Sequence, residues 1–190
     1  MEERRAAIDR IFAETIRVHE ALRTADQEPL LRAIDAVATA LNGGQAVLAF
    51  GNGGSAADAQ HFAAELVGRF ERERRAVPVL ALTTDTSALT AIGNDYGFDQ
   101  VFARQIEAFG APGDVAIALT TSGRSPNVLA GLEAAQARGL TTIALTGRDG
   151  GEAGRMVDIH LHVPHESTAR VQEAHRTLLH VICALVEEGL

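Results

Sequence analysis

The sequence predicts an α/β protein, a three-layer αβα sandwich with a five-stranded parallel sheet preceded by N-terminal helices. Two observations predict this fold class. Five short and nearly continuously apolar segments follow residue 45, as expected for strands that are buried on both faces. Segments with helical periodicity separate most of them, and this alternation is typical of parallel strands joined by right-handed crossovers. The 190 residues suit a single domain with a sizeable core.

Residues 1–44 predict two amphipathic helices. Apolar residues recur at helical spacing from Ile8 to Leu22, and again from Leu30 to Leu41 after a break at Pro29. The second series ends at Asn42-Gly43-Gly44, a typical helix stop. We expect these helices to pack against the domain or against another subunit, with a role in oligomerisation.

Residues 45–190 form the predicted αβα core, and residues 1–190 are predicted to be one domain. The expected strands are Ala46–Phe50, Val77–Leu82, Val115–Leu119, Thr141–Leu145 and Ile159–Val163. The expected helices are Ser55–Val67, Phe98–Phe109, Pro126–Arg138 and about Arg170–Glu187. The charged run Glu71–Arg75 is expected to be a solvated loop before the second strand.

Composition excludes several classes of chemistry. All 17 Lys and Arg residues are arginine, so a lysine Schiff base and a phosphate-loop lysine are excluded. The net charge of -8 disfavours affinity based on nucleic-acid phosphates. The single Cys183 excludes an internal disulfide. Because the first residues are charged and no run of about 18 apolar residues occurs, we expect a soluble cytoplasmic protein without a membrane partner.

The first predicted strand runs into the glycine-rich segment Gly51-Asn52-Gly53-Gly54-Ser55. Ser55 and Asp58 predict a helix start resembling a capping box. Backbone N–H groups and the positive end of the helix dipole make such a turn receptive to phosphate. The alternative is a tight turn that needs glycine only for its backbone.

A second loop, after the third predicted strand, is rich in hydroxyl groups. Thr120, Thr121, Ser122 and Ser125 precede Pro126, and a serine before a proline predicts a helix start. Four hydroxyls at the carboxyl end of a parallel strand can hold a phosphate without lysine. The alternative is a capping loop that binds no ligand.

The glycine segment also matches a G-x-G-x-x-A dinucleotide fingerprint. The acidic residue expected about 20 residues further on is absent, since Asp85 lies too far along the chain. The hydroxyl-rich loop has no role in that scheme either. Nicotinamide binding is therefore a minor alternative.

Two helices carry side chains that could do acid–base or metal chemistry. His61 and Glu65 are four residues apart, so they lie on one helix face, where they could share a metal or a proton. Gln172 and His180 share a broad face of the last helix, and His180 lies within an apolar run. The alternatives are an ordinary surface pair and a core or interface histidine.

Several stretches together resemble the phosphoheptose isomerases, a family of the sugar isomerase (SIS) fold, which is flavodoxin-like. These stretches are Gly51–Leu66, Thr83–Ser87, Ala91–Phe98, Thr121–Val128 and Ala169–His175, in order along nearly the whole chain. The resemblance implies an aldose–ketose isomerase that converts sedoheptulose 7-phosphate to D-glycero-D-manno-heptose 7-phosphate through an enediol. This reaction is the first step toward ADP-heptose and lipopolysaccharide.

The resemblance also implies roles for individual residues. The sugar would contact Asn52, Gly53, Gly54, Asn94, Asp95, Glu65 and Gln172. The phosphate would be held by Ser55, Thr120, Thr121, Ser122 and Ser125, and Thr120 replaces a serine that is usual in the family. One zinc per subunit would be bound by His61, Glu65, Gln172 and His180, of which Glu65 and His180 form the catalytic pair. The family forms homotetramers with sites between subunits.

Four protein ligands would close a tetrahedral zinc, whereas catalytic sites keep one position open. Either substrate adds to or replaces a ligand, or Glu65 is not always bound. The competing hypothesis is a non-catalytic SIS protein that binds a partner such as a replication initiator. A phosphosugar-sensing regulator is a weaker third hypothesis. Because a scaffold has no need for Glu65 and His180 in these places, we favour the enzyme.

Overall fold

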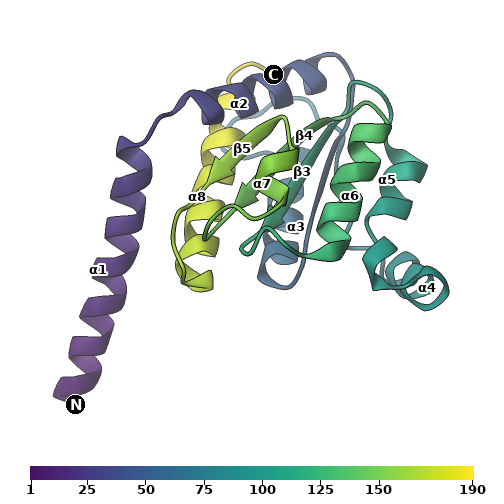
Figure 1. Cartoon of the computed structure of the whole chain (residues 1–190). Helices are drawn as coiled ribbons and strands as arrows, with labels where there is room; N and C mark the ends of the chain where they lie inside the picture. The colour runs from purple at the N-terminus through teal and green to yellow at the C-terminus, as the bar shows by residue number, and fades with distance from the viewer.

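The computed structural model describes residues 1–190 (Figure 1). It contains a single five-stranded sheet. The strands are β1 (Val47–Gly51), β2 (Val79–Ala81), β3 (Val115–Thr120), β4 (Thr141–Thr146) and β5 (Ile159–His162). All neighbouring strands pair in parallel, in the order β2-β1-β3-β4-β5. The α/β class and the parallel sheet predicted from the sequence are confirmed.

Helices cover both faces of the sheet. One face packs against α2 (Glu28–Asn42), α3 (Gly54–Val67) and α8 (Thr168–Glu187), and the other against α5 (Ala103–Phe109), α6 (Pro126–Ala137) and α7 (Ala153–Met156). Along β1, Val47 and Ala49 enter the first core while Leu48 and Phe50 enter the second. This alternation follows from the period of two in a strand, and it confirms the three layers.

Two helices lie largely outside these layers. Helix α1 (Glu2–Thr24) projects from the body of the molecule (Figure 1). The C-terminal half of α1 contacts α8, and Val18 is the only residue of α1 that is buried. Helix α4 (Thr86–Tyr96) buries no residue, and the short 3-10 helix η1 (Phe98–Gln100) follows it. No helix combines the length and the apolar character needed to cross a bilayer.

Three local details differ from the sequence prediction. Helices α4 and α7 were not expected, and the helix expected over Phe98–Phe109 is interrupted at Val101 and Phe102. The capping role expected for Ser55 and Asp58 is wrong, because α3 begins at Gly54 and Asp58 instead pairs with Arg176 on α8.

The strand order places β1 and β3 side by side, with their crossovers running in opposite directions. Strand β1 continues through α3 to β2 on one side, whereas β3 continues through α6 to β4 on the other. In open α/β sheets, ligands bind at the carboxyl ends of strands at such a switch point. The glycine-rich and hydroxyl-rich loops follow these two strands.

Candidate active site

The glycine-rich loop turns sharply from β1 into α3. Gly53 adopts φ 57 and ψ -121, in the left-handed region that favours glycine. Gly54 lies against the side-chain amide of Gln172 on α8, which would have to move if a Cβ were added at Gly54. The loop therefore brings the N-terminus of α3 and the side chain of Gln172 into contact.

The hydroxyl-rich loop is held in place by its own side chains. Thr120 is buried, and its Oγ1 accepts a hydrogen bond from the backbone N–H of Gly123 at 3.2 Å. Ser125 is the N-cap residue of α6, as expected, and Pro126 is its first residue. The hydroxyl group that Thr120 keeps in place of serine thus shapes the loop.

Asn52 links the two loops. Its side-chain amide exchanges two hydrogen bonds with the amide of Asn127, at 2.8 and 2.9 Å. Asn127 lies in the first turn of α6 and is almost fully buried. The pair fixes the distance between the glycine-rich loop and the start of α6.

A pocket of about 280 Å³ lies between these loops. Its lining is polar and consists of Asn52, Gly53, Gly54, Ser55, Leu119, Thr120, Thr121, Ser122, Ser125, Thr168 and Gln172. The first turns of α3 and α8 and the N-cap of α6 all contribute to this wall. Helix N-termini carry partial positive charge, so a pocket lined by three of them can bind an anion without lysine.

Farther along the same two helices, three titratable side chains form a cluster. The Nε2 atoms of His61 on α3 and His180 on α8 are 2.7 Å apart, and Glu65 Oε1 is 3.4 Å from His61 Nε2. One ligand atom from each of the three residues lies within 4.8 Å of the others, close enough to hold a metal ion. All three residues are half-buried.

Burial is the main reason that the pKa of His180 is below its ordinary value. The nearby His61 lowers the pKa further, and the Glu65 carboxylate opposes both effects. A neutral imidazole has a free lone pair at one nitrogen, so it can act as a metal ligand or accept a proton.

Asn94 and Asp95 lie elsewhere in this chain. Both are exposed near the end of α4, where the amide of Asn94 donates to Asp95 Oδ1 at 2.7 Å. Neither lines the polar pocket. The structure therefore brings together the glycine loop, the hydroxyl loop and Gln172, and in a single subunit it leaves Asn94 and Asp95 outside this pocket.

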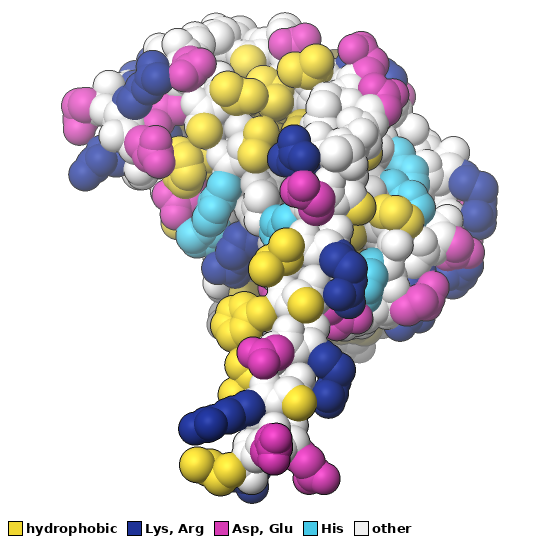
Figure 2. Space-filling model, turned by 90° about the vertical axis from the view of Figure 1, so that its left-hand side faces the viewer, with side chains coloured by type: hydrophobic (Ala, Val, Ile, Leu, Met, Phe, Trp, Pro, Cys, Tyr) yellow, Lys and Arg dark blue, Asp and Glu magenta, His cyan; other side chains and the backbone are white.

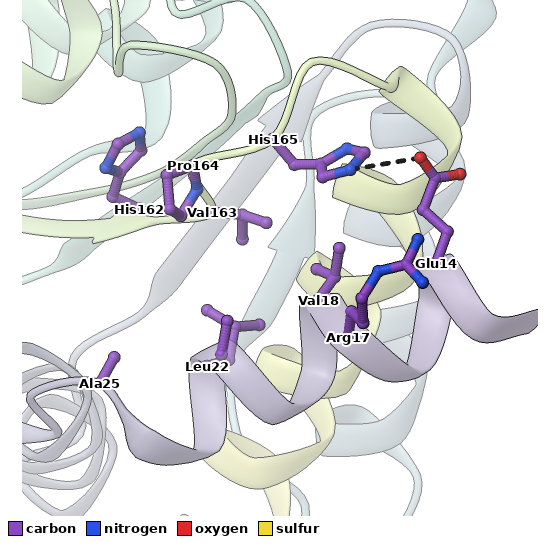
Figure 3. Close-up of a pocket in the computed structure, with 10 residues that line it drawn as sticks. Glu14, Arg17, Val18, Leu22, Ala25, His162, Val163, Pro164 and His165 are labelled. Carbon is purple, nitrogen blue, oxygen red and sulfur yellow. Dashed lines mark ion pairs between the residues drawn. The ribbon is translucent and has the colours of Figure 1, made fainter.

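A larger pocket of about 410 Å³ lies between α1 and the segment after β5 (Figure 3). Val18 and Leu22 of α1 face Val163 there, and Glu14 forms an ion pair with His165 at 3.5 Å. None of the site residues predicted from the sequence lines this pocket. Its wall is mostly α1, so it belongs to the projecting helix and not to the polar site.

Comparison with known proteins decides the family. The SIS domain family model matches residues 11–147. The chain is 55% identical over 181 residues to the phosphoheptose isomerase of Aquifex aeolicus, covering 95% of each protein. The structure of phosphoheptose isomerase from Neisseria gonorrhoeae matches with a TM-score of 0.91 and 46% identity, over 99% of this chain and 100% of that one. The chain belongs to the phosphoheptose isomerase family.

Two other solved structures resemble this chain, one at the level of the family and one at the level of the fold. The phosphoheptose isomerase from Francisella tularensis also matches with a TM-score of 0.91, at 37% identity over 96% of this chain and 97% of that one. The sugar isomerase domain of an RpiR transcription factor from Sphaerobacter thermophilus matches with a TM-score of 0.66 at 22% identity, over 94% of this chain and 90% of that one. The second likeness concerns the SIS fold alone.

Two polar residues of the pocket region were not among the site residues predicted from the sequence. Thr168 lines the pocket from the first turn of α8, and buried Asn127 pairs with Asn52. The Ser167-Thr168 pair is a helix-start signal that could have revealed the first. No local pattern reveals the second, because it depends on how two loops meet.

Proposed function

We propose that the protein is an aldose–ketose isomerase that interconverts sedoheptulose 7-phosphate and D-glycero-D-manno-heptose 7-phosphate. One observation carries the proposal. A polar pocket lies at the N-termini of α3 and α8, and the cluster of His61, Glu65 and His180 lies farther along the same two helices. A substrate with phosphate at one end and reacting carbons at the other fits this order.

The phosphate would occupy the polar pocket. Ser55, Thr120, Thr121, Ser122 and Ser125 offer hydroxyl donors, and the helix ends offer backbone N–H groups. Ser55 and His61 are six residues apart on α3, which corresponds to about 9 Å along the axis. Phosphate binding at this remove from the reacting carbons supplies positioning energy for the chemical step.

The reaction moves a proton between C1 and C2 through an enediol. We assign removal and return of the carbon-bound proton to the Glu65 carboxylate, and proton transfer at the two oxygens to His180. Burial lowers the pKa of His180, which keeps its imidazole neutral and able to accept an oxygen-bound proton. Asn52, Gly53, Gly54 and Gln172 would orient the sugar between the phosphate site and this pair.

The cluster fits a zinc ion. Two imidazole Nε2 atoms that face each other at 2.7 Å need either a shared proton or a shared cation, and a carboxylate oxygen lies beside them. Two nitrogens and one oxygen are a typical zinc donor set, and Gln172 from α8 is proposed as a further ligand. When bound, the metal would polarise the substrate carbonyl and the neighbouring hydroxyl.

The test is conversion of sedoheptulose 7-phosphate in deuterium oxide, followed by NMR, with and without added zinc. We expect the wild type to form the manno-heptose 7-phosphate, with deuterium at C2 where the abstracted proton exchanges with solvent. Glu65→Gln and His180→Gln should each lower kcat by about 10²-fold or more, because each removes an acid–base group.

Asp99→Asn, in η1 and outside the pocket and the cluster, is the control variant and should retain the wild-type rate. Folding of each variant would be checked by circular dichroism. A folded wild type that forms no product with any divalent metal would overturn the isomerase proposal. The non-catalytic alternative is not favoured. The proteins from Aquifex aeolicus and a Geobacter species that are 55% and 53% identical to this chain are both phosphoheptose isomerases.

We also propose that the protein is a homotetramer with shared sites. On α1, the apolar residues Ile8, Ile11, Phe12 and Ile16 are each at least half exposed, and apolar side chains gather along the projecting helix (Figure 2). A stripe of this kind is typical of a subunit interface. The position of Asn94 and Asp95 outside the pocket of their own chain supports sites completed by a partner. A cytoplasmic location and the lack of a nucleic-acid partner stay predictions.

A further inference from the structure

Glu187 breaks a local rule at the end of α8. A carboxylate at a helix C-terminus is disfavoured by the helix dipole, yet Glu187 is the last residue of α8 and its side chain is 1% exposed. Its two oxygens accept hydrogen bonds from the backbone N–H groups of Phe70, Glu71 and Arg72, at 2.9, 2.8 and 2.7 Å. Glu187 therefore anchors the segment that follows α3.

Arg74 completes this anchor from the other side. Its side chain is 5% exposed, and its Nε is 3.3 Å from Glu187 Oε1. Its Nη2 donates to the backbone carbonyl of Glu65 at 3.0 Å, and its Nη1 donates to that of Gly68 at the same distance. One guanidinium thus ties the C-terminal end of α3, at Glu65 itself, to the C-terminal end of α8.

The anchored segment reaches the cluster through Phe70. The Phe70 ring packs against the imidazole of His180, with ring centroids 5.5 Å apart and planes tilted by 40°. The His180 ring also lies near that of His61, with ring centroids 5.0 Å apart. His180 therefore packs against both the Phe70 ring and its partner in the cluster.

We propose that Glu187 and Arg74 form a latch between α3 and α8, and that Phe70, held by this latch, positions His180 for metal binding and catalysis. All three are positioning residues, since none contributes an atom to the cluster. The latch sets the relation between the helix that carries His61 and Glu65 and the helix that carries His180. The inference rests on the proposed function for its catalytic part only, because metal affinity reports on it independently.

The chain contains a matched control for the latch. Arg72 and Glu188 join the same two segments by an ion pair of 2.7 Å, but their side chains are 60% and 52% exposed. Exposed pairs contribute little, whereas loss of one partner from a buried pair is costly. Glu188→Gln therefore makes the same chemical change one residue away from the latch.

The experiment measures the zinc dissociation constant of the full-length protein by competition with a chromogenic chelator, together with kcat, KM and thermal unfolding. We expect Glu187→Gln and Phe70→Leu to weaken zinc binding by about tenfold or more and to lower kcat, with KM for the sugar phosphate nearly unchanged. Phe70→Tyr, which keeps the ring, and Glu188→Gln should bind zinc like the wild type.

Two outcomes would overturn the latch. One is a set of folded Glu187→Gln and Phe70→Leu variants that unfold at lower temperature but bind zinc as tightly as the wild type. The other is an equal loss in Glu188→Gln. If the wild type bound zinc in a latch-dependent way but formed no isomerised product, the latch would stand and the proposed function would fall.

Discussion

His175 illustrates how one buried side chain of α8 can affect the whole fold. The residue is fully buried, and this burial lowers its pKa from 6.5 to about 4, against the opposing effects of the Thr146 backbone and of Asp58. An unfolded chain binds a proton at this residue below pH 6.5, whereas the folded chain does not until about pH 4. The folded state therefore loses stability as the pH falls through this window.

This pKa shift predicts the acid sensitivity of the protein. Between pH 7 and pH 5, His175 should lower the free energy of unfolding by about 2 kcal/mol, because each pKa unit corresponds to about 1.4 kcal/mol. His175→Gln removes the titrating group, so its free energy of unfolding should depend less on pH in this range. Urea unfolding of both proteins at the two pH values measures the difference, and parallel curves would contradict the prediction.

At the level of single residues, sequence patterns identified the titratable side chains of the cluster, but they did not predict every contact between helices. Spacing alone placed His61 and Glu65 on one face of a helix, and the structure brings them together with His180. The same reasoning gave Asp58 a capping role, because it could not foresee Arg176 on α8 as a partner. Asp58 and Arg176 are 118 residues apart in the sequence. Their contact depends on how two helices pack, and a short sequence pattern carries no information about that packing.

Among the elements, two glycine-containing loops are in close contact beside the polar pocket. Gly123 and Gly151 both have positive φ, and a Cβ on either residue would collide with the backbone of the other loop. The carbonyl of Gly123 also accepts a hydrogen bond from the N–H of Ala153 at 3.0 Å. The loop after β4 therefore packs against the hydroxyl-rich loop and holds it in place.

Gly151→Ala should consequently weaken phosphate binding. The methyl group would displace the hydroxyl-rich loop, so we expect KM for the sugar phosphate to rise by about tenfold, or about 1.4 kcal/mol of binding energy. Gly44→Ala is the control, because Gly44 also has a positive φ, at 83°, but has open space around it.

The control should cost about 1 kcal/mol of stability through its left-handed backbone and leave KM unchanged. Steady-state kinetics and thermal unfolding separate the two effects. An equal rise in KM for both variants would show that backbone strain, and not the contact between loops, is responsible.

Sequence periodicity predicted the buried elements better than the exposed ones. The five strands and α6 carry apolar residues that the core requires, and all of them were expected at nearly their observed positions. Helix α4 has no fully buried residue, and only Leu89 and Ile92 of its apolar side chains pack against the core, so its helical pattern is weak. Asp85 caps the helix by accepting a hydrogen bond from the N–H of Ala88. Hydrophobic periodicity is imposed only on residues that contact the core, so exposed elements show little of it.

At the scale of the whole molecule, the positions of Glu65 and Asp95 predict complementation between subunits. If each site combines Glu65 of one subunit with Asp95 of another, Glu65→Gln and Asp95→Asn homo-oligomers should both be nearly inactive. Co-expression of the two variants should restore about a quarter of the wild-type activity, since random mixing leaves that share of sites intact.

Light scattering would establish the mass of the mixed oligomer, and the isomerase assay would give its activity. Mixed oligomers of tetramer mass without recovered activity would place both residues in sites made by one subunit. A monomeric mass for the wild type would contradict the tetramer itself.

The pairing of α3 with α8 also has a consequence for biosynthesis. The segment that contains His61 and Glu65 leaves the ribosome more than a hundred residues before the segment that contains His180. While α8 is still in the exit tunnel, the nascent chain lacks His180 of the cluster, and one face of its sheet is covered by α2 and α3 alone. Docking of α8 therefore completes the cluster of His61, Glu65 and His180 and this side of the core in one event.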